Sequence, residues 1–376
     1  MSMKYILQVH TGSWHAAHAG TEDIIRRIGE ISSRIPVGKV IIGWNTDPSV
    51  YKEAGAFLRG KGIQMLLWLP AFSEVNKEAE TDGTLDIFGE KILPPATAEE
   101  EGFVFGCPSS GRNLRAVKEI YEKYFSGCGF DGVFLDRIRS QSFFAGVSGV
   151  LSCGCGRCRK AFLERGVDID EVGRMYALKK DSFFDMDSFP PDGEFRLKDA
   201  AAQRFFEAKE KIIADAVTEI CRYFKGKGLT VGLDLFAPVV SRFVGQNYPL
   251  ITKDADFIKP MLYRRTEAPA GIGYEYALFE KCAPGAQGRG KLSMDQAFLE
   301  TQLEAVGRVA CEKYPGIEIN YDEELVRTDA GYIRESLAAI RERGFEGAAL
   351  CWNAMQAPDA HIEAAAELQD EGGDTL

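Results

Sequence analysis

The amino-acid sequence predicts an α/β protein folded as a (β/α)8 TIM barrel with long loops on the C-terminal face. Short, nearly uninterrupted apolar runs recur along the 376 residues, as is typical of parallel strands buried on both faces. Amphipathic helical patterns lie between these runs. The alternative, a doubly wound open sheet, is disfavoured because the segment VHTGSWHAAHAG after the first run contains no G-x-G-x-x-G phosphate loop.

The expected strands are the apolar runs, and the expected helices follow ordinary start and stop signals. The strands cover residues 4–10, 39–45, 63–70, 131–138, 229–236, 256–263, 317–323 and 347–353. Asp47 followed by Pro48 predicts the start of a helix, and Gly60 predicts its end. Further helices are expected over residues 199–224, 294–313 and 329–343, and a last one after Pro358.

Three insertions lengthen the regular spacing of strands and helices. Residues 71–110 follow the third strand, 139–197 the fourth and 264–292 the sixth. Since all three follow strands, they are expected on the C-terminal face, where barrel active sites are built. We therefore expect residues 1–365 to form a single barrel domain with these insertions, followed by an acidic tail over 366–376.

The composition limits the kinds of partner. A formal net charge of −11 argues against nucleic acid and against an anionic membrane surface. No stretch approaches the roughly 20 apolar residues needed to span a bilayer, and the start MSMKYILQVHTG lacks the features of a signal peptide. We expect a cytoplasmic protein that acts on a small molecule without an organic cofactor. The sequence leaves open whether it forms a homo-oligomer.

Three carboxylates at expected strand ends are candidates for catalysis. Asp136 ends an otherwise apolar strand, and Asp234 interrupts the apolar pattern of the next strand in the same way. Because these strands are neighbours in a barrel, the two carboxylates could share one pocket. Asp322, on the seventh strand, would face them across the mouth. The structural alternative for Asp136 is an ion pair with Arg137 or Arg139.

A carboxylate pair at a barrel mouth indicates glycoside hydrolysis. One group protonates the leaving oxygen, and the other attacks the sugar or activates water. Side chains at the same strand ends are expected to bind the substrate, since an indole stacks on the apolar face of a sugar. This set comprises His10, Trp44, Trp68, Arg139, Tyr263, Trp352 and Asn353. For each tryptophan, the alternative is packing in the top layer of the core.

The predicted function is therefore a glycoside hydrolase that cleaves a short oligosaccharide or glycoside. Two alternatives remain open at this stage. One is a carbohydrate-binding barrel that has the cleft but lacks the acid. The other is a hydrolase of another bond, such as an amide, that also uses a carboxylate pair.

The segment SCGCGRC contains three closely spaced thiols, Cys153, Cys155 and Cys158. Three thiolates with this C-x-C-x-x-C spacing can surround one tetrahedral zinc ion, which needs a fourth ligand. Cys107 is the best candidate because it also lies in an insertion of the C-terminal face, whereas Cys128 precedes the fourth strand at the opposite end. Four thiolates would fill the coordination sphere and make the zinc structural. The alternative, a redox pair, is disfavoured by the third thiol.

The segments FGCPSSGRNLRAVKEIYEKY and SCGCGRCRKAFLERGVDIDEV resemble the zinc element of family 42 glycoside hydrolases, the β-galactosidases. That resemblance implies Cys107, Cys153, Cys155 and Cys158 as zinc ligands beside the active site. The segments GFDGVFLDRIRSQ, VGLDLFAP and VGQNYPLITKDADFIKPMLY resemble uncharacterised glycoside-hydrolase-like TIM barrels, which implies Asp136 as the principal catalytic carboxylate. Family 42 has an Asn-Glu pair where this chain has Asp-Arg, so the catalytic roles of that family are not carried over.

Overall fold

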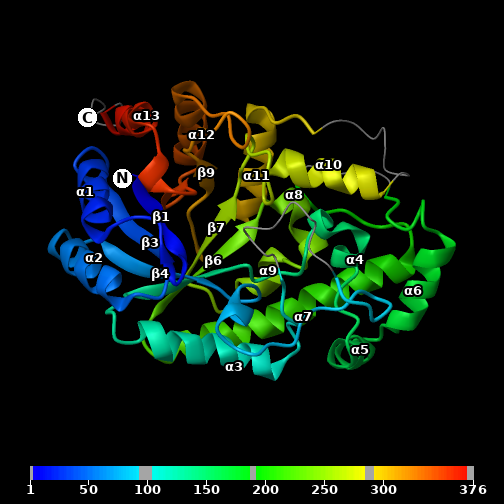
Figure 1. The fold of residues 1–376 in the computed structure, drawn as a ribbon. Coiled ribbons are helices and arrows are strands. Elements are labelled where there is room, and N and C mark those ends of the chain that lie inside the picture. The colour runs from blue at the N-terminus through cyan, green and yellow to red at the C-terminus, as the bar shows by residue number, and fades with distance from the viewer. Residues whose placement is uncertain (1–2, 93–103, 187–191, 284–291, 371–376) are drawn as a thin grey trace.

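The predicted barrel is confirmed. The computed structural model describes residues 3–92, 104–186, 192–283 and 292–370, and its parallel strands close into an eight-stranded barrel (Figure 1). In order around the barrel the strands are β1 (Lys4–Trp14), β3 (Val37–Asn45), β4 (Gln64–Pro70), β5 (Gly132–Asp136), β6 (Thr230–Phe236), β7 (Phe257–Met261), β9 (Gly316–Glu318) and β10 (Gly347–Cys351). Pairing of β10 with β1 closes the ring.

Two strands are accessory to this ring. The two residues of β2 (Ala16–Ala17) form a hairpin with the end of β1, and β8 (Glu312–Lys313) pairs with β7 ahead of β9. The seventh strand is shorter than expected, since β9 ends at Glu318 instead of continuing to residue 323. Beyond it, Asn320 Oδ1 accepts hydrogen bonds from the backbone N–H groups of Trp352 and Asn353, at 3.0 Å each. The chain after β9 is therefore tied to the loop after β10.

Helices cover the outside of the barrel between the strands. They are α1 (Thr21–Ser32), α2 (Pro48–Gly60), α3 (Gly111–Ile120), α7 (Ala200–Lys225), α9 (Tyr248–Ile251), α11 (Gln296–Gly307), α12 (Ala330–Glu342) and α13 (Asp359–Asp370). The predicted bounds of α2 are confirmed, and the Asp47 carboxylate caps it by accepting a hydrogen bond from Ser49 N. Residues 366–370, expected in the tail, complete α13, while residues 371–376 lie outside the described part of the chain.

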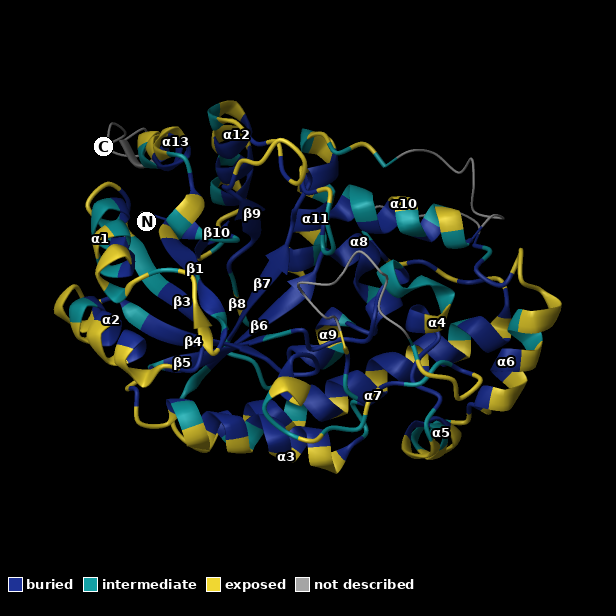
Figure 2. Ribbon diagram, viewed as in Figure 1, coloured by how far each residue is buried: buried dark blue, intermediate teal, exposed yellow. Residues whose placement is uncertain are grey.

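The insertions pack together beside the barrel around a hydrophobic cluster of their own. Each one contributes buried side chains, for example Ile87, Phe143 and Phe279, and the first half of α7 completes the cluster. The helices in this layer are α4 (Gly146–Val150), α5 (Gly156–Leu163), α6 (Ile169–Leu178) and α10 (Ile272–Cys282), while the short helix α8 (Pro238–Ser241) follows β6 and packs on the barrel core. Figure 2 shows α5 and α6 beside α7, with exposed residues on the outer side of both. Residues 93–103, 187–191 and 284–291 of the insertions are outside the described residues.

Aromatic rings fill the barrel below its mouth. The rings of Phe134 on β5 and Phe257 on β7 stack with their centroids 6.0 Å apart. Gly232 on β6, between these strands, leaves the room they need, because a Cβ atom there would lie 2.0 Å from the ring of Phe257. Among the described residues, no helix combines the length and the apolar composition needed to cross a membrane.

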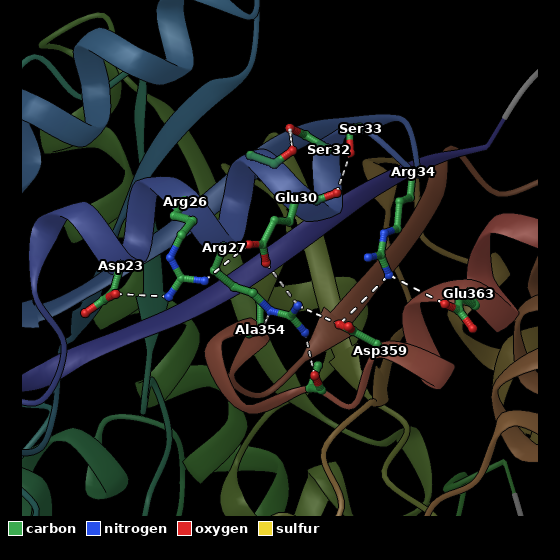
Figure 3. A network of polar contacts seen from close by, with 12 residues as sticks. Asp23, Arg26, Arg27, Glu30, Ser32, Ser33, Arg34, Ala354, Asp359 and Glu363 are labelled. Atoms are coloured by element: carbon green, nitrogen blue, oxygen red, sulfur yellow. Dashed lines mark hydrogen bonds and ion pairs between the residues drawn. The ribbon is translucent and has the colours of Figure 1, made fainter.

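The two ends of the chain are joined by polar contacts where β10 meets β1. From α1, the Arg27 guanidinium donates to Ala354 O at 3.3 Å, to Ala357 O at 2.5 Å and to the Asp359 carboxylate at 2.7 Å (Figure 3). Its neighbour Arg26 is exposed and, among the described residues, pairs with the acidic side chains of Asp23 and Glu30 on its own helix. Arg27 therefore links the helix after the first strand to the segment after the last one.

Replacing Arg27 with alanine is expected to lower the free energy of unfolding by about 1.5–3 kcal/mol, because two carbonyls and a carboxylate lose a charged donor. Urea denaturation followed by circular dichroism measures this change. Arg26→Ala is the matched control on the same helix, and it should leave the unfolding midpoint unchanged because exposed ion pairs contribute little. Equal effects of the two substitutions would contradict this role for Arg27.

Candidate functional site

Asp136 and Asp234 lie side by side at the C-terminal ends of neighbouring strands. Leu135 of β5 pairs with Leu233 of β6, so the residues that follow stand at the same level of the barrel. Asp136 is half-buried, whereas Asp234 is only 3% exposed. The negative charge of Asp136 is among the influences that raise the pKa of Asp234. The structure thus brings together the two carboxylates that the sequence placed on adjacent strands.

Two N–H groups hold the Asp136 carboxylate in place. Trp68 Nε1, at the end of β4, donates to Asp136 Oδ2 at 2.9 Å, and the backbone N–H of Arg137 donates to Oδ1. Arg137 has a φ of 52°, in the left-handed region, which ends the strand and turns the chain at this point. The structural alternative for Asp136, an ion pair with Arg137 or Arg139, is not seen among the described residues, where Arg137 pairs with Glu74.

Backbone strain is concentrated beside Asp136. Of the four non-glycine residues with positive φ among the described residues, three are in contact: Trp44 at 95°, Glu74 at 64° and Arg137 at 52°. The Arg137 guanidinium lies 4.6 Å from the ring centroid of Trp44, and its Nη1 lies 2.9 Å from Glu74 Oε1. Strained residues persist where the surrounding contacts fix them, and such clusters are common at functional sites.

Three rings form an aromatic wall next to Asp136. The centroids of Trp44 and Trp68 lie 5.6 Å apart, and His10 is 5.6 Å from Trp44 and 6.0 Å from Trp68, all edge to face. Trp44 Nε1 is buried and has no hydrogen-bond partner within the described residues. Burial lowers the pKa of His10 to about 4, with help from the charges of His18 and Arg137. His10 therefore adds a neutral ring to this wall.

Asp234 is surrounded by a different set of groups, centred on Lys259 of β7. The Lys259 ammonium donates to Asp234 Oδ2 at 2.9 Å, to Tyr263 Oη at 2.9 Å and to Gln8 Oε1 at 3.3 Å, so each of its three hydrogens has an acceptor. Asp234 Oδ1 is buried without a partner among the described residues. Burial raises the pKa of Asp234 to about 7 despite the opposing charge of Lys259.

Trp352, Asn353 and Tyr263 also reach the barrel mouth. The rings of Tyr263 and Trp352 meet edge to face at 6.2 Å. Asn353 Oδ1 accepts a hydrogen bond from the backbone N–H of His10 at 3.3 Å, which joins the end of β10 to that of β1. The predicted substrate-binding residues at or just after the ends of β1, β3, β4, β7 and β10 therefore lie at the same end of the barrel as the two aspartates.

Asp322 is not part of this group. It is exposed, and its Oδ1 accepts hydrogen bonds from the backbone N–H groups of Glu324 and Leu325 at 2.9 Å each, which caps a turn. These bonds lower the pKa of its carboxyl. The expectation that Asp322 faces the other two carboxylates from the seventh strand is wrong, because β9 ends at Glu318 and Asp322 lies beyond it. Glu318 itself is fully buried and accepts hydrogen bonds from Arg265 N and Tyr332 Oη.

Two carboxylates near the site were not recognised in the sequence. Glu74 contacts Arg137 from the first insertion, and Glu275 lies on α10, where burial raises its pKa. Both come from insertions, whose folding onto the barrel leaves no periodic signal in the sequence. In the segment after β1, His15 contacts Glu78 and Thr46, while the ring of His18 packs on that of His10.

The four cysteines singled out by their spacing form a buried cluster. The sulfurs of Cys107, Cys153, Cys155 and Cys158 all lie within 4.8 Å of one another, and Cys107 Sγ is 3.4 Å from both Cys155 Sγ and Cys158 Sγ. Hydrogen bonding with Cys153 raises the pKa of Cys107, whereas hydrogen bonding with Cys107 lowers those of Cys153 and Cys155. Backbone N–H groups also point at sulfur, from Leu85 to Cys153 and from Cys158 to Cys155, at 3.5 Å each.

This donor set fits a metal ion. Bonds of about 2.3 Å would place the sulfurs of a tetrahedral zinc site about 3.8 Å apart, close to the spacing seen. As predicted, the cluster joins the first insertion, which contains Cys107, to the second, which contains the other three cysteines. Gly154 N also donates to Leu85 O at 3.0 Å, which is a further contact between the two insertions. Cys128, which the sequence excluded, lies apart and contacts Tyr124 O.

Comparison with known proteins identifies the fold. No protein-family model and no curated protein sequence matches the chain. Among solved structures, the chain is similar to the PgaB (BpsB) glycoside hydrolase domain from Bordetella bronchiseptica, with a TM-score of 0.64 and 14% identity over 97% of this chain and 98% of that one. The resemblance of the cysteine element to family 42 is not confirmed by these comparisons.

Two further structures have the same barrel. Alpha-L-fucosidase isoenzyme 2 from Paenibacillus thiaminolyticus has a TM-score of 0.56 and 12% identity, over 99% of this chain and 49% of that one. The C-terminal domain of a putative chitinase from Desulfitobacterium hafniense has a TM-score of 0.52 and 12% identity, over 98% of this chain and 99% of that one. At these identities the similarity shows the fold alone. The chain is a TIM barrel, as these glycoside hydrolase structures are.

Proposed function

We propose that this protein is a glycoside hydrolase that cleaves a short oligosaccharide or glycoside with Asp136 and Asp234. The observation that carries the proposal is the difference between the surroundings of two adjacent carboxylates. Asp136 accepts two N–H hydrogen bonds, while burial raises the pKa of Asp234 to about 7. Environments that separate the protonation of two such groups are how glycosidases assign an acid and a base.

In this mechanism Asp234 is the acid and Asp136 the nucleophile or base. The proton of Asp234 passes to the glycosidic oxygen as its bond to the anomeric carbon breaks, and Lys259 stabilises the carboxylate that remains. Asp136 attacks the anomeric carbon or takes a proton from the attacking water. The wall of Trp44, Trp68 and His10 would stack against the sugar.

The choice of Asp234 over Asp322 as the acid follows from their positions, because Asp322 caps an exposed turn. Similarity to the fold of a glycoside hydrolase domain and a putative chitinase domain supports the proposed class of reaction. A sugar-binding barrel without catalysis and a hydrolase of another bond would have the same aromatic wall. The experiment below distinguishes both of these alternatives from the proposed glycoside hydrolase.

Hydrolysis of a panel of chromogenic glycosides by the purified protein tests the proposal. Asp136→Asn should lower kcat by a factor of about 10²–10⁴, the usual contribution of such a group. In the wild type, kcat/KM should fall as pH rises through about 7, because Asp234 then loses the proton it donates. Asp234→Asn should abolish that dependence together with most of the activity. The control is Asp322→Asn, which should retain wild-type activity.

Full activity of Asp136→Asn would contradict the assignment of the residue. Sugar binding by the wild type without cleavage of any glycoside in the panel would favour the binding barrel. Cleavage of amides in place of glycosides would favour the other hydrolase.

We also propose that the four-cysteine cluster holds a structural zinc ion. The ligands would be Cys107, Cys153, Cys155 and Cys158, which leave no open position for a substrate. The ion would tie the first two insertions together beside the barrel and would take no part in the reaction.

Freshly purified protein is expected to contain one zinc ion per chain by elemental mass spectrometry. Cys107→Ser should lose the zinc and unfold at a lower temperature in calorimetry, because binding energy at a structural site contributes to folding. Cys128→Ser, a buried thiol outside the cluster, is the control and should keep the ion. Zinc-free protein with a Cys155 to Cys158 disulfide would contradict the proposal.

A further inference from the structure

The peptide bond that follows Asp136 is held by the first insertion. Its carbonyl oxygen accepts a hydrogen bond from Ala71 N at 2.8 Å, and its N–H donates to the Asp136 carboxylate. The Arg137 side chain is held slightly further along the same insertion, where Nη1 donates to Ser73 Oγ at 3.1 Å and to Glu74 Oε1 at 2.9 Å. One short segment of the insertion therefore contacts both the backbone and the side chain of the turn beside Asp136.

Both members of the ion pair between Glu74 and Arg137 are buried in unfavourable backbone conformations. Glu74 is 1% exposed and Arg137 is 8% exposed, and their φ angles of 64° and 52° lie in the left-handed region. Such conformations persist only where the surrounding contacts fix them. Because φ is the rotation about the N–Cα bond, fixing the Arg137 side chain in this conformation also fixes the direction of its N–H, which donates to Asp136.

Glu74 is itself anchored within the first insertion. Its second carboxylate oxygen pairs with the ammonium group of Lys77, three residues further along. Next to it, Phe72 O accepts a hydrogen bond from Gly106 N at 2.6 Å, which joins the start of the insertion to its end. Glu74 therefore has contacts of its own that hold it in place, and it can fix the position of Arg137.

Arg139, the other arginine expected near Asp136, does not share this role. Its guanidinium carbon lies 4.8 Å from the ring centroid of Phe105 and 4.4 Å from that of Phe236. Its Nη1 donates to Ser140 O at 2.9 Å. None of these contacts involves Asp136 or the peptide bond that follows it, so of the two arginines Arg137 is the one that orients the carboxylate.

A second buried pair of glutamate and arginine provides a comparison. Arg242 Nε donates to Glu210 Oε1 at 2.6 Å, and the Glu210 side chain is 3% exposed. This pair joins α7 to the segment that follows α8, and neither residue has a positive φ. The pair of Glu74 and Arg137 differs because the backbone of its arginine donates to a candidate catalytic carboxylate.

We propose that Glu74 is a positioning residue that acts through Arg137 to hold the Asp136 carboxylate in the orientation that the reaction needs. Two N–H groups orient this carboxylate, one from Trp68 Nε1 at 2.9 Å and one from the backbone of Arg137. Loss of Glu74 releases the turn that carries the second donor. The role in catalysis rests on the proposed function, whereas the effect on the geometry of Asp136 does not.

Two measurements on the purified protein test the proposal. The indole N–H signal of Trp68 in nitrogen-15 NMR spectra, assigned with Trp68→Phe, reports the hydrogen bond to Asp136. In Glu74→Ala this signal should move toward its position in Asp136→Ala. With a glycoside that the wild type cleaves, Glu74→Ala should lower kcat about 10–100-fold and change KM less than about two-fold, because a misplaced carboxylate slows the reaction without removing a contact to the substrate.

Two further variants separate positioning from a general loss of stability. Glu74→Gln keeps an uncharged acceptor for Arg137 and should recover part of the lost kcat. Glu210→Ala, the matched control, breaks the other buried pair and should keep both the Trp68 signal and kcat, even where it lowers the melting temperature. If Glu74→Ala does not fold, Glu74→Gln should show the same two effects at smaller size.

A Glu74 variant that is folded by its melting curve and keeps the wild-type Trp68 signal would overturn the proposal. Wild-type kcat in such a variant, or an equal loss of kcat in Glu210→Ala, would overturn it as well. If the wild type cleaves no glycoside, the hydrolase is refuted, and the Trp68 signal alone then decides whether Glu74 positions Asp136.

Discussion

The contact between Lys259 and Asp234 inside the barrel is the interaction on which the candidate site depends. An ammonium group 1% exposed has no access to water, and its three hydrogens are taken by Asp234, Tyr263 and Gln8. Strands β1, β6 and β7 are thereby fixed to one another at the level of the site. The same contact holds Asp234 in the interior, where burial raises its pKa, and leaves its second oxygen without a partner.

Asp136 depends on a second set of constraints that comes from outside the barrel. The first insertion supplies Glu74, which pairs with Arg137 and holds it in a strained turn against Trp44. That turn directs the Arg137 N–H to Asp136, and Trp68 fixes the other oxygen. The insertions in turn pack on one another around the cysteine cluster. The position of one carboxylate is therefore linked, through the insertions, to the proposed zinc site.

The barrel and the cysteine cluster could be predicted because both leave local signals in the sequence. Apolar runs mark the strands, and the C-x-C-x-x-C spacing marks three sulfurs that a short segment can bring together. Asp136 and Asp234 follow from the same strand pattern. The position of Asp322 was not predicted, since the polar end of the seventh run gives no sign that β9 stops at Glu318. The positions of Glu275 and of a cavity beside Arg139 are set by how the insertions fold onto the barrel. No periodic pattern in the sequence predicts that folding.

The central claim is that Asp234, beside Asp136, keeps its proton up to about pH 7. Carbon-13 NMR of protein labelled at the aspartate carboxyl groups measures this directly, with the Asp234 signal assigned from Asp234→Asn. The account predicts that Asp234 titrates near pH 7, and at a lower pH in Asp136→Asn, because the charge of Asp136 is one cause of the raised pKa. Titration below pH 5 in both proteins would contradict it.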